Sequence, residues 1–287
     1  MRSALHWPAG SVATDRDPVC ITPELAGWRY TGLDVIRLVA GETRAVSTGS
    51  REMLVLPLSG GCRVEVEGHR FELRGRPDVF AGSSDFVYLP SRSDATITSG
   101  GGECALPWAE AATRLVPRRY PADVTPAEIR GAGRATRRIR NLFVAGSSVA
   151  ERLVVVEVVT PPGNWSSYPP HKHDDDAVPG EARLEEIYYF RIPGPGGFGV
   201  HRTYTADGSL DETVMVRDGD VFLVPRGYHG PCAAPPDFSM YYLNVLAGPG
   251  TTRSLGFSDD PTYAWIRGAW AGQDPDPRLT PGAEASA

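Results

Sequence analysis

Two histidines stand one residue apart in the stretch "YPPHKHDDD", which runs from Tyr168 to Asp176. In an extended chain, side chains two positions apart point to the same side, so His171 and His173 can bring two imidazole nitrogens to one point in space. Imidazole is a common ligand of divalent transition metals. The pair therefore predicts half of a metal site, with a solvated, charged turn as the alternative interpretation.

Further candidate ligands follow along the chain. Glu185 and Glu186 open the apolar stretch "EEIYYFRI", and His229 follows the proline-glycine turn of "DGDVFLVPRGYH". Three imidazoles and one carboxylate can hold a divalent metal and leave coordination positions for water or substrate. Because neighbouring strands of a small barrel bring distant inward-facing residues together, we predict one site made of His171, His173, His229 and either Glu185 or Glu186.

The elements that must position these residues are short strands. The sequence has 32 glycines and 26 prolines, and long amphipathic helical patterns are scarce. Stretches such as "MLVLPLSG" and "DFVYLPS" in the first half, and "RLVVVEVVT" and "SMYYLNVLAG" in the second, are typical of strands between turns. The sequence therefore predicts an all-β protein with two β units of similar length.

A weak sequence similarity between the two halves of the chain supports a duplication. The string "SSDFVYLPSRSDATI" is similar to "DGDVFLVPRGYHGPC", but only the second copy contains a histidine. Between the two units lies a segment with three prolines and the basic run "RGAGRATRRIR". We predict a flexible N-terminus over residues 1–20, a first barrel without metal over 21–115, a linker over 116–141, a metal-binding second barrel over 142–272, and a flexible tail over 273–287.

Composition narrows the class of protein and its partners. A hydrophobic content of 41% and a charged content of 22% are typical of soluble globular proteins. No apolar run is long enough to predict a membrane span, and no signal peptide is readable, so the expected location is the cytoplasm. The net charge of −6 argues against a nucleic-acid partner, and the basic run is either a solvated face or a small anion patch. Four separated cysteines without a CxxC pair argue against a disulfide framework.

The second half of the chain resembles the metal motifs of the cupin superfamily. The proline-x-glycine turn at residues 225–227 is as in the superfamily, but His229 comes one residue early and the usual asparagine is missing. Twelve residues separate His173 from Glu186, where the superfamily has three or four. The superfamily glutamate stands directly before the apolar run of its strand, which favours Glu186 as the ligand and leaves Glu185 as the alternative.

A closer resemblance covers nearly the whole chain. The strings "ITPELAGWRYTGLDVIRL", "IRGAGRATRRIRN", "TPPGNWSSYPPHKHD", "LEEIYYFRI" and "YYLNVLAGP" are similar to the 5-deoxy-glucuronate isomerase family of myo-inositol catabolism. That family is similar to 4-deoxy-L-threo-5-hexosulose-uronate ketol-isomerase, a two-cupin enzyme that holds zinc in one barrel. The resemblance implies a two-domain cupin (bicupin) of two small antiparallel β-barrels. It also implies conversion of 5-deoxy-D-glucuronate to 2-deoxy-5-keto-D-gluconate.

The implied aldose–ketose isomerisation assigns roles to candidate residues. The resemblance implies a divalent metal, zinc in the first place and Mn²⁺ or Fe²⁺ as alternatives, and its expected ligands are His171, His173, Glu186 and His229. A positioned side chain must also move a proton, and the candidates are Glu185, Tyr188, Tyr228, Tyr242 and Lys172. Arginine suits the substrate carboxylate through its bidentate fork, and the substrate-binding candidates are Arg202, Arg226, Tyr204 and Asn244.

Other interpretations stay open at this point. The arginines could form surface ion pairs, and the tyrosines could simply pack in the core. The same metal ligands suit an iron-dependent cupin dioxygenase, and a non-catalytic sugar-binding cupin is a third reading. The expected partner is a small sugar acid, with no nucleic acid and no membrane, and the chain could assemble as a homo-oligomer.

Overall fold

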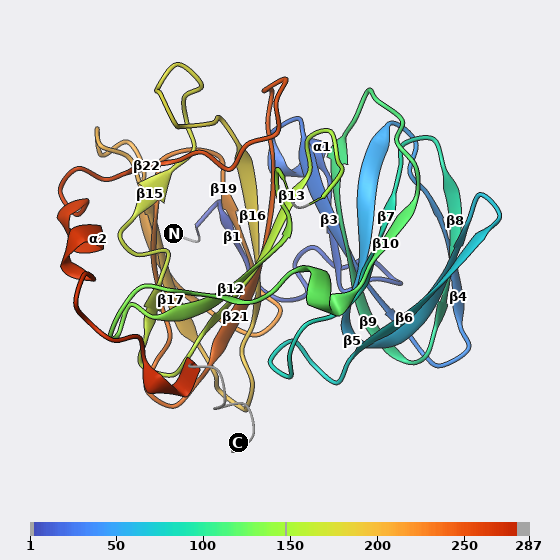
Figure 1. Ribbon diagram of the computed structural model, residues 1–287, viewed down its shortest axis with the longest axis horizontal. Helices are drawn as coiled ribbons and strands as arrows, with labels where there is room; N and C mark the ends of the chain where they lie inside the picture. Colours follow the sequence, from blue (N-terminus) through green and yellow to red (C-terminus); the bar gives the residue numbers. More distant parts are fainter. Residues whose placement is uncertain (1–2, 147, 280–287) are drawn as a thin grey trace.

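Residues 3–146 and 148–279 are described in a computed structural model of the chain, and they form two β-barrels that lie side by side (Figure 1). The first barrel is blue to green in Figure 1. Its long strand β5 pairs with β7 and β9 along its first half and with β6 and β8 along its second. Its strands are β2 (Val19–Ile21), β3 (Thr31–Leu38), β4 (Thr43–Ser47), β5 (Arg51–Val66), β6 (His69–Arg76), β7 (Phe86–Leu89), β8 (Asp94–Ser99), β9 (Gly102–Glu110) and β10 (Arg118–Tyr120).

The second barrel consists of antiparallel sheets that pack around one core. One sheet contains β1 (His6–Trp7), β11 (Glu128–Arg130), β12 (Arg137–Phe143), β13 (Val154–Thr160), β16 (Glu185–Arg191), β19 (Val221–Val224) and β21 (Met240–Ala247). The other contains β14 (Trp165–Ser166), β15 (His171–Lys172), β17 (Gly199–Tyr204), β18 (Asp211–Val216), β20 (Tyr228–Ala233) and β22 (Ser258–Asp259). Helical segments are short: α1 (Pro23–Ala26), α2 (Trp265–Ala269) and the 3-10 turns Ala122–Val124 and Pro277–Leu279. The prediction of an all-β protein is confirmed.

The central sheets of the two barrels have matching strand orders. The first runs β10-β7-β5-β9-β3-β2, and the second runs β1-β19-β16-β21-β13-β12-β11. The six strands of the first order have counterparts in the first six of the second, so β5 corresponds to β16 and β3 corresponds to β13, and β11 is additional. The duplication that the sequence indicates only weakly is therefore visible in the topology.

The two central sheets are buried on both faces. Along β16, Ile187 and Tyr189 pack in the core between the barrels, whereas Tyr188 and Phe190 pack inside the second barrel. This alternation follows from the two-residue period of a strand. Because neither face meets water, the strands are almost continuously apolar in sequence, and every residue of β21 is buried.

Two carboxylates, the buried Glu52 and the half-buried Glu185, join the barrels in a reciprocal way. Glu52, near the start of β5, accepts hydrogen bonds from the backbone N–H groups of residues 151–153, which lead into β13. Glu185, at the start of β16, accepts from the N–H groups of residues 29–31, which lead into β3. Each carboxylate thus satisfies backbone donors of the other barrel. An ion pair between Arg76 and Glu157 lies fully buried in the same interface.

The ends of the chain and the region between the barrels differ from the sequence prediction. The predicted flexible N-terminus, residues 1–20, contains β1, which pairs with β19 of the second barrel, and His6 hydrogen-bonds Asp220 at 2.7 Å. The predicted linker, 116–141, contains β10, β11 and the start of β12. The strands β1, β10 and β11 escape sequence patterns because they have only two or three residues each.

The described part of the predicted tail contains regular structure. In the predicted tail, 273–287, residues up to 279 include a 3-10 turn and a bridge from Pro275 to Gly133, and residues 280–287 lie outside the described part of the chain. The limits predicted for the two barrels, 21–115 and 142–272, stay predictions.

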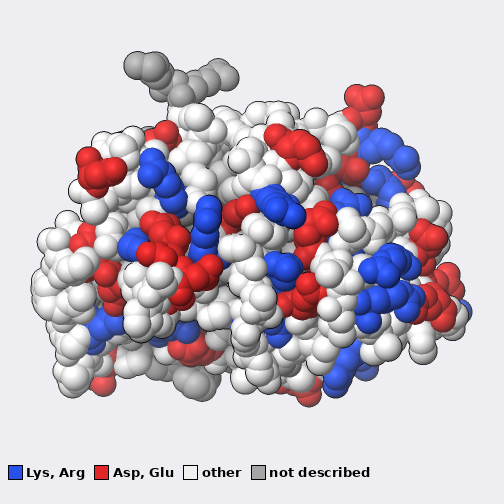
Figure 2. Space-filling model, turned by 90° about the horizontal axis from the view of Figure 1, so that it is seen from above, with Lys and Arg blue, Asp and Glu red and all other residues white. Residues whose placement is uncertain are grey.

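Charged side chains of both signs are mixed on the surface. On the face shown in Figure 2, Lys and Arg lie next to Asp and Glu rather than forming a field of one sign. Exposed ion pairs such as Arg63 with Glu72 are examples of this mixing. Among the described residues, no helix has the length and apolar character needed to cross a bilayer.

The reciprocal carboxylates predict a test of stability. Replacing Glu52 with Gln turns one acceptor oxygen into an NH2 donor that faces other donors, so we expect the free energy of unfolding to fall by roughly 1–3 kcal/mol. The matched control is Glu72→Gln, because Glu72 is exposed on β6, and it should change stability by less than about 0.5 kcal/mol. Urea unfolding followed by tryptophan fluorescence measures both, and equal midpoints for the two variants would contradict the prediction.

Candidate metal centre

Three histidines meet inside the second barrel. His171 on β15 lies directly opposite His229 on β20, and their ring centroids are 4.4 Å apart. His173 follows two residues later, with its ring centroid 5.3 Å from each of the other two. One ligand nitrogen from each ring lies within 4.8 Å of the others. The structure thus brings together the three histidines that the sequence predicts as ligands.

The turn before His229 depends on a glycine. Gly227 has φ of +92°, and a Cβ at this position would lie 2.6 Å from the carbonyl oxygen of Tyr204. Only glycine fits such a backbone conformation without strain. The proline-x-glycine turn therefore has a steric function: it lets β20 start close to β17 and aims His229 into the barrel.

A carboxylate reaches the same point from the opposite sheet. Glu186 lies on the inner face of β16, and its Oε2 is 3.1 Å from Nε2 of His229. Neither of these two atoms has a hydrogen-bond partner among the described residues, and Nδ1 of His171 also lacks one. Buried polar atoms normally have partners, so three such atoms around one point fit a bound cation.

The protonation states of the cluster also fit a bound cation. Burial lowers the pKa of all three histidines, for His173 to about 4, so the rings are neutral and carry free lone pairs. Burial raises the pKa of Glu186 to about 8. A carboxylate buried without a cation is costly, and a divalent metal would offset that cost while using the neutral imidazoles as ligands.

Backbone carbonyls orient two of the imidazole rings. Nδ1 of His173 hydrogen-bonds the carbonyl oxygen of Gly256 at 2.7 Å, and Nδ1 of His229 hydrogen-bonds that of Gly227 at 3.3 Å. A carbonyl oxygen only accepts, so each Nδ1 carries the proton and each Nε2 keeps its lone pair. Such contacts fix the tautomer and the orientation of a metal-binding histidine.

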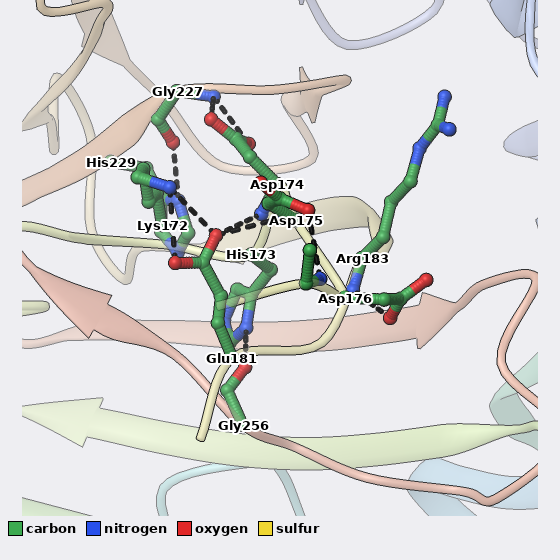
Figure 3. Close-up of polar contacts among 11 residues, drawn as sticks. Lys172, His173, Asp174, Asp175, Asp176, Glu181, Arg183, Gly227, His229 and Gly256 are labelled. Atoms are coloured by element: carbon green, nitrogen blue, oxygen red, sulfur yellow. Dashed lines mark hydrogen bonds and ion pairs between the residues drawn. The ribbon is translucent and has the colours of Figure 1, made fainter. Parts of the chain in front are cut away.

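The twelve residues between His173 and Glu186 form an acidic insertion relative to the cupin motif, and this insertion has a structural role. The carboxylate of Glu181 accepts hydrogen bonds from Nζ of Lys172 at 2.7 Å and from the backbone N–H groups of Asp174 and Asp175 (Figure 3). Asp174 in turn accepts from the backbone N–H of Gly227, in the turn before His229. The insertion therefore ties the His-x-His segment to the turn that carries the third histidine.

A pocket opens beside the cluster, and side chains from several strands line it. Its polar lining includes Ser167, Tyr188, Tyr242, Asn244, Asn141, Arg130 and Arg137, besides His171, His173 and Glu186. Its apolar lining includes Phe257, Leu255 and Leu246. Of the predicted catalytic and substrate-binding residues, Tyr188, Tyr242 and Asn244 thus lie at the pocket.

The two tyrosines form one hydrogen-bonded group. Their hydroxyl groups lie 3.2 and 3.1 Å from Oγ of Ser167. Burial raises the pKa of both phenols well above the usual range. Tyr188 and Tyr242 are therefore protonated at neutral pH.

The structure places three of the predicted catalytic residues away from the pocket. Glu185 faces the first barrel, where it accepts backbone hydrogen bonds, because it lies on the opposite face of β16 from Glu186. Lys172 is paired with Glu181, and Tyr228 packs against the ring of Tyr204. The catalytic assignments of Glu185, Lys172 and Tyr228 do not fit these positions.

The predicted carboxylate-binding arginines also lie elsewhere. Arg202 forms an exposed bidentate ion pair with Asp211, a neighbour across the β17–β18 hairpin. Arg226 is exposed and contacts Ser209. The hydroxyl of Tyr204 donates to Asp260. None of Arg202, Arg226 and Tyr204 lines the pocket, so their assignment to substrate binding does not fit the structure.

Sequence reasoning missed other residues of the pocket. Arg137 and Arg130 belong to the basic run, and its interpretation as a small anion patch is the signal that could have found them. Phe257 and Leu255 follow β21 in a loop whose sequence gives no sign of its position. His201, a conceivable proton-transfer group, is fully buried between Cys232 and Thr203, outside the pocket.

The cluster predicts which residues control metal content. Alanine at His171, His173 or His229 should give folded protein with less than stoichiometric metal, because the apolar strands supply most of the stability and the metal adds only binding energy. Glu186→Gln should weaken metal binding, whereas Glu185→Gln should keep the metal and lose stability. Atomic emission and circular dichroism measure these outcomes, with His69→Ala on the exposed side of β6 as control. Full occupancy in a His171→Ala, His173→Ala double variant would exclude the site.

Buried neutral histidines predict a pH dependence of the metal-free protein. Burial lowers the pKa of His201 to about 3 from an ordinary value of 6.5. Below pH 6.5 the histidine binds a proton in the unfolded chain but not in the folded protein, so the free energy of unfolding falls as the pH falls. For a histidine with a pKa of about 3 in the folded protein, the loss is about 2 kcal/mol between about pH 7 and pH 5. Unfolding titrations at both pH values should show this loss, and His201→Gln should reduce it. A pH-independent stability would contradict the prediction.

Comparison with known proteins places the chain in a family. Residues 7–266 match the KduI/IolB family. The chain is 42% identical over 273 residues to 5-deoxy-glucuronate isomerase of Geobacillus kaustophilus, covering 92% of this chain and 95% of that protein. It is 36% identical over 249 residues to 5-deoxy-glucuronate isomerase of Bacillus subtilis, covering 86% and 91%.

Solved structures agree with this placement. The crystal structure of an IolB-like protein from Salmonella typhimurium superposes with a TM-score of 0.86 at 36% identity, covering 92% of this chain and 99% of that one. Oxalate decarboxylase of Lactobacillus farciminis, at 13% identity and a TM-score of 0.64, covers 90% of this chain and 89% of its own and shares the fold alone. The predicted bicupin fold is confirmed, as is the resemblance read from the sequence. The chain belongs to the KduI/IolB family.

Proposed function

We propose that this chain is a metal-dependent isomerase that converts 5-deoxy-D-glucuronate to 2-deoxy-5-keto-D-gluconate in myo-inositol catabolism. The observation that carries the proposal is the cluster of His171, His173, His229 and Glu186, in which unpartnered ligand atoms converge beside a pocket. Relatives named 5-deoxy-glucuronate isomerase, which align with most of the chain, support this choice of substrate.

The reaction transfers a proton between neighbouring carbons, and it creates negative charge on the oxygens of an enediolate. A divalent metal in this cluster would supply Lewis-acid stabilisation of that charge. We propose Zn²⁺, with Mn²⁺ or Fe²⁺ as alternatives, because imidazole and carboxylate ligands suit all of these metals. His171, His173, His229 and Glu186 would hold the metal, and the pocket beside them would admit the substrate.

The residues beside the cluster have roles that suit this chemistry. Tyr188 and Tyr242 keep their protons, so their hydroxyl groups can donate hydrogen bonds to substrate oxygens. Ser167 holds the two hydroxyl groups next to each other. The Nδ2 atom of Asn244 is buried without a partner among the described residues, and it can donate to a substrate hydroxyl group. Fixed donors in a largely dry site stabilise developing charge more strongly than water does.

The first barrel has a supporting role in this proposal. If Glu52 and Glu185 are equivalent, as their reciprocal contacts indicate, then Met53 in the first barrel stands where Glu186 stands in the second. Met53 is buried and apolar, so it offers no carboxylate for a cation. We propose that the first barrel binds no metal and that it stabilises the second. A cytoplasmic location and assembly as a homo-oligomer belong to the same proposal.

The proposal has a direct test. Metal-replete protein incubated with 5-deoxy-D-glucuronate should form the ketose, observed by NMR, and chelation of the metal should stop the reaction. Oxygen uptake without formation of the ketose would favour the dioxygenase alternative. Binding of the sugar acid without any turnover would favour the non-catalytic alternative.

A further inference from the structure

A buried arginine lines the pocket beside the metal cluster. Arg137 is the first residue of β12, and it is only 4% exposed. It shares the pocket lining with His171 and Glu186, and its positive charge contributes to the lowered pKa of His171. Arg137 is therefore close to the cluster but is not one of its ligands.

Arg137 has no acidic partner among the residues that the structure describes. Its hydrogen bond to protein runs from Nη1 to the carbonyl oxygen of Ala135 at 3.1 Å, and its guanidinium group lies 5.4 Å from the ring centre of Trp270. The neighbouring Arg130 and Arg267 each form a bidentate ion pair, with Glu128 and Asp259 respectively. Arg137 thus differs from both neighbours, because its guanidinium group has N–H donors that are not paired with a carboxylate and can bind a ligand.

The charge of Arg137 is not lost through burial. Burial and the repulsion of Arg130 and Arg267 lower its pKa to about 10, which still leaves the group protonated at neutral pH. A buried charge without a counter-ion is destabilising, because the lost hydration is not replaced. An anion that enters the pocket would supply the missing counter-ion of Arg137, so its binding would be favourable.

We propose that Arg137 binds the carboxylate of the substrate and thereby makes the site selective for sugar acids over neutral sugars. This inference rests on the proposed function, in which the other end of the substrate lies at the metal cluster. A carboxylate pairs with the planar fork of arginine through two parallel hydrogen bonds. Trp270 and Ala135 hold the guanidinium group in place, so little side-chain freedom is lost on binding.

The experiment compares two substrates in matched variants. One substrate is 5-deoxy-D-glucuronate, and the other is the neutral analogue with a hydroxymethyl group in place of the carboxylate. Arg137→Met should lower kcat/KM for the uronate on the order of 10- to 100-fold, as expected for lost hydrogen bonds to a charged group. The neutral analogue should be unaffected. Arg202→Met, which removes a partly exposed arginine that is paired with Asp211 outside the pocket, is the control and should change neither value.

Further measurements separate a binding role from a structural one. Arg137→Met should keep its metal and should unfold at the same or a higher temperature, because it removes a buried, uncompensated charge. Arg137→Lys keeps the charge without the fork, so it should lose less on the uronate than Arg137→Met. It also provides the comparison of the two substrates if the methionine variant fails to fold. Equal losses on both substrates, or no loss on the uronate, would overturn the proposal.

Failure of this inference can be told from failure of the proposed function. If the native protein does not isomerise 5-deoxy-D-glucuronate, the proposed function fails, and calorimetric titration with the same compound then tests Arg137 by itself. Binding to the native protein that weakens in Arg137→Met but not in Arg202→Met supports the carboxylate site. Equal binding by all three proteins, or none by any, contradicts it.

Discussion

Burial of the two central sheets on both faces is the constraint on which the rest of the structure depends. Each sheet packs one face on the other barrel and the other face on its own interior, so alternate residues of a strand have different tasks. Glu185 and Glu186 illustrate this division, because adjacent carboxylates on β16 belong to different environments. One satisfies backbone donors of the first barrel, and the other joins the histidine cluster.

The same constraint gives the site its chemistry. The neighbouring strands β16 and β21 bury Glu186, Tyr188 and Tyr242, which keeps the phenols protonated and makes the carboxylate dependent on a cation. The histidines come from the facing sheet, whose short strands are held by side chains of the acidic insertion. A rigid apolar sheet and a facing sheet fixed by polar contacts together form the pocket.

Parts of the fold and of the site could be predicted from the sequence because they depend on local pattern. The two-residue period of a strand predicts that His171 and His173 point to the same side and that Glu185 and Glu186 point to opposite sides. The proline-x-glycine turn indicates that His229 points into the barrel. The pairing of the arginines could not be predicted in this way, since Arg202 meets Asp211 across a hairpin and Arg137 meets no acid. Burial decides which arginine is available, and burial of Arg137 depends on elements far apart in the sequence.

The pairing of β1 with the second barrel has a consequence for how the molecule forms. Strand β1, from the first residues of the chain, completes the sheet of the second barrel by pairing with β19. During synthesis, His6 and Trp7 therefore find their partners only after residues 221 and 222 have been made. Contacts between such distant segments slow folding. A cut between the barrels would leave the second one with an open sheet edge at β19, so we expect the two similar halves to fold together rather than independently.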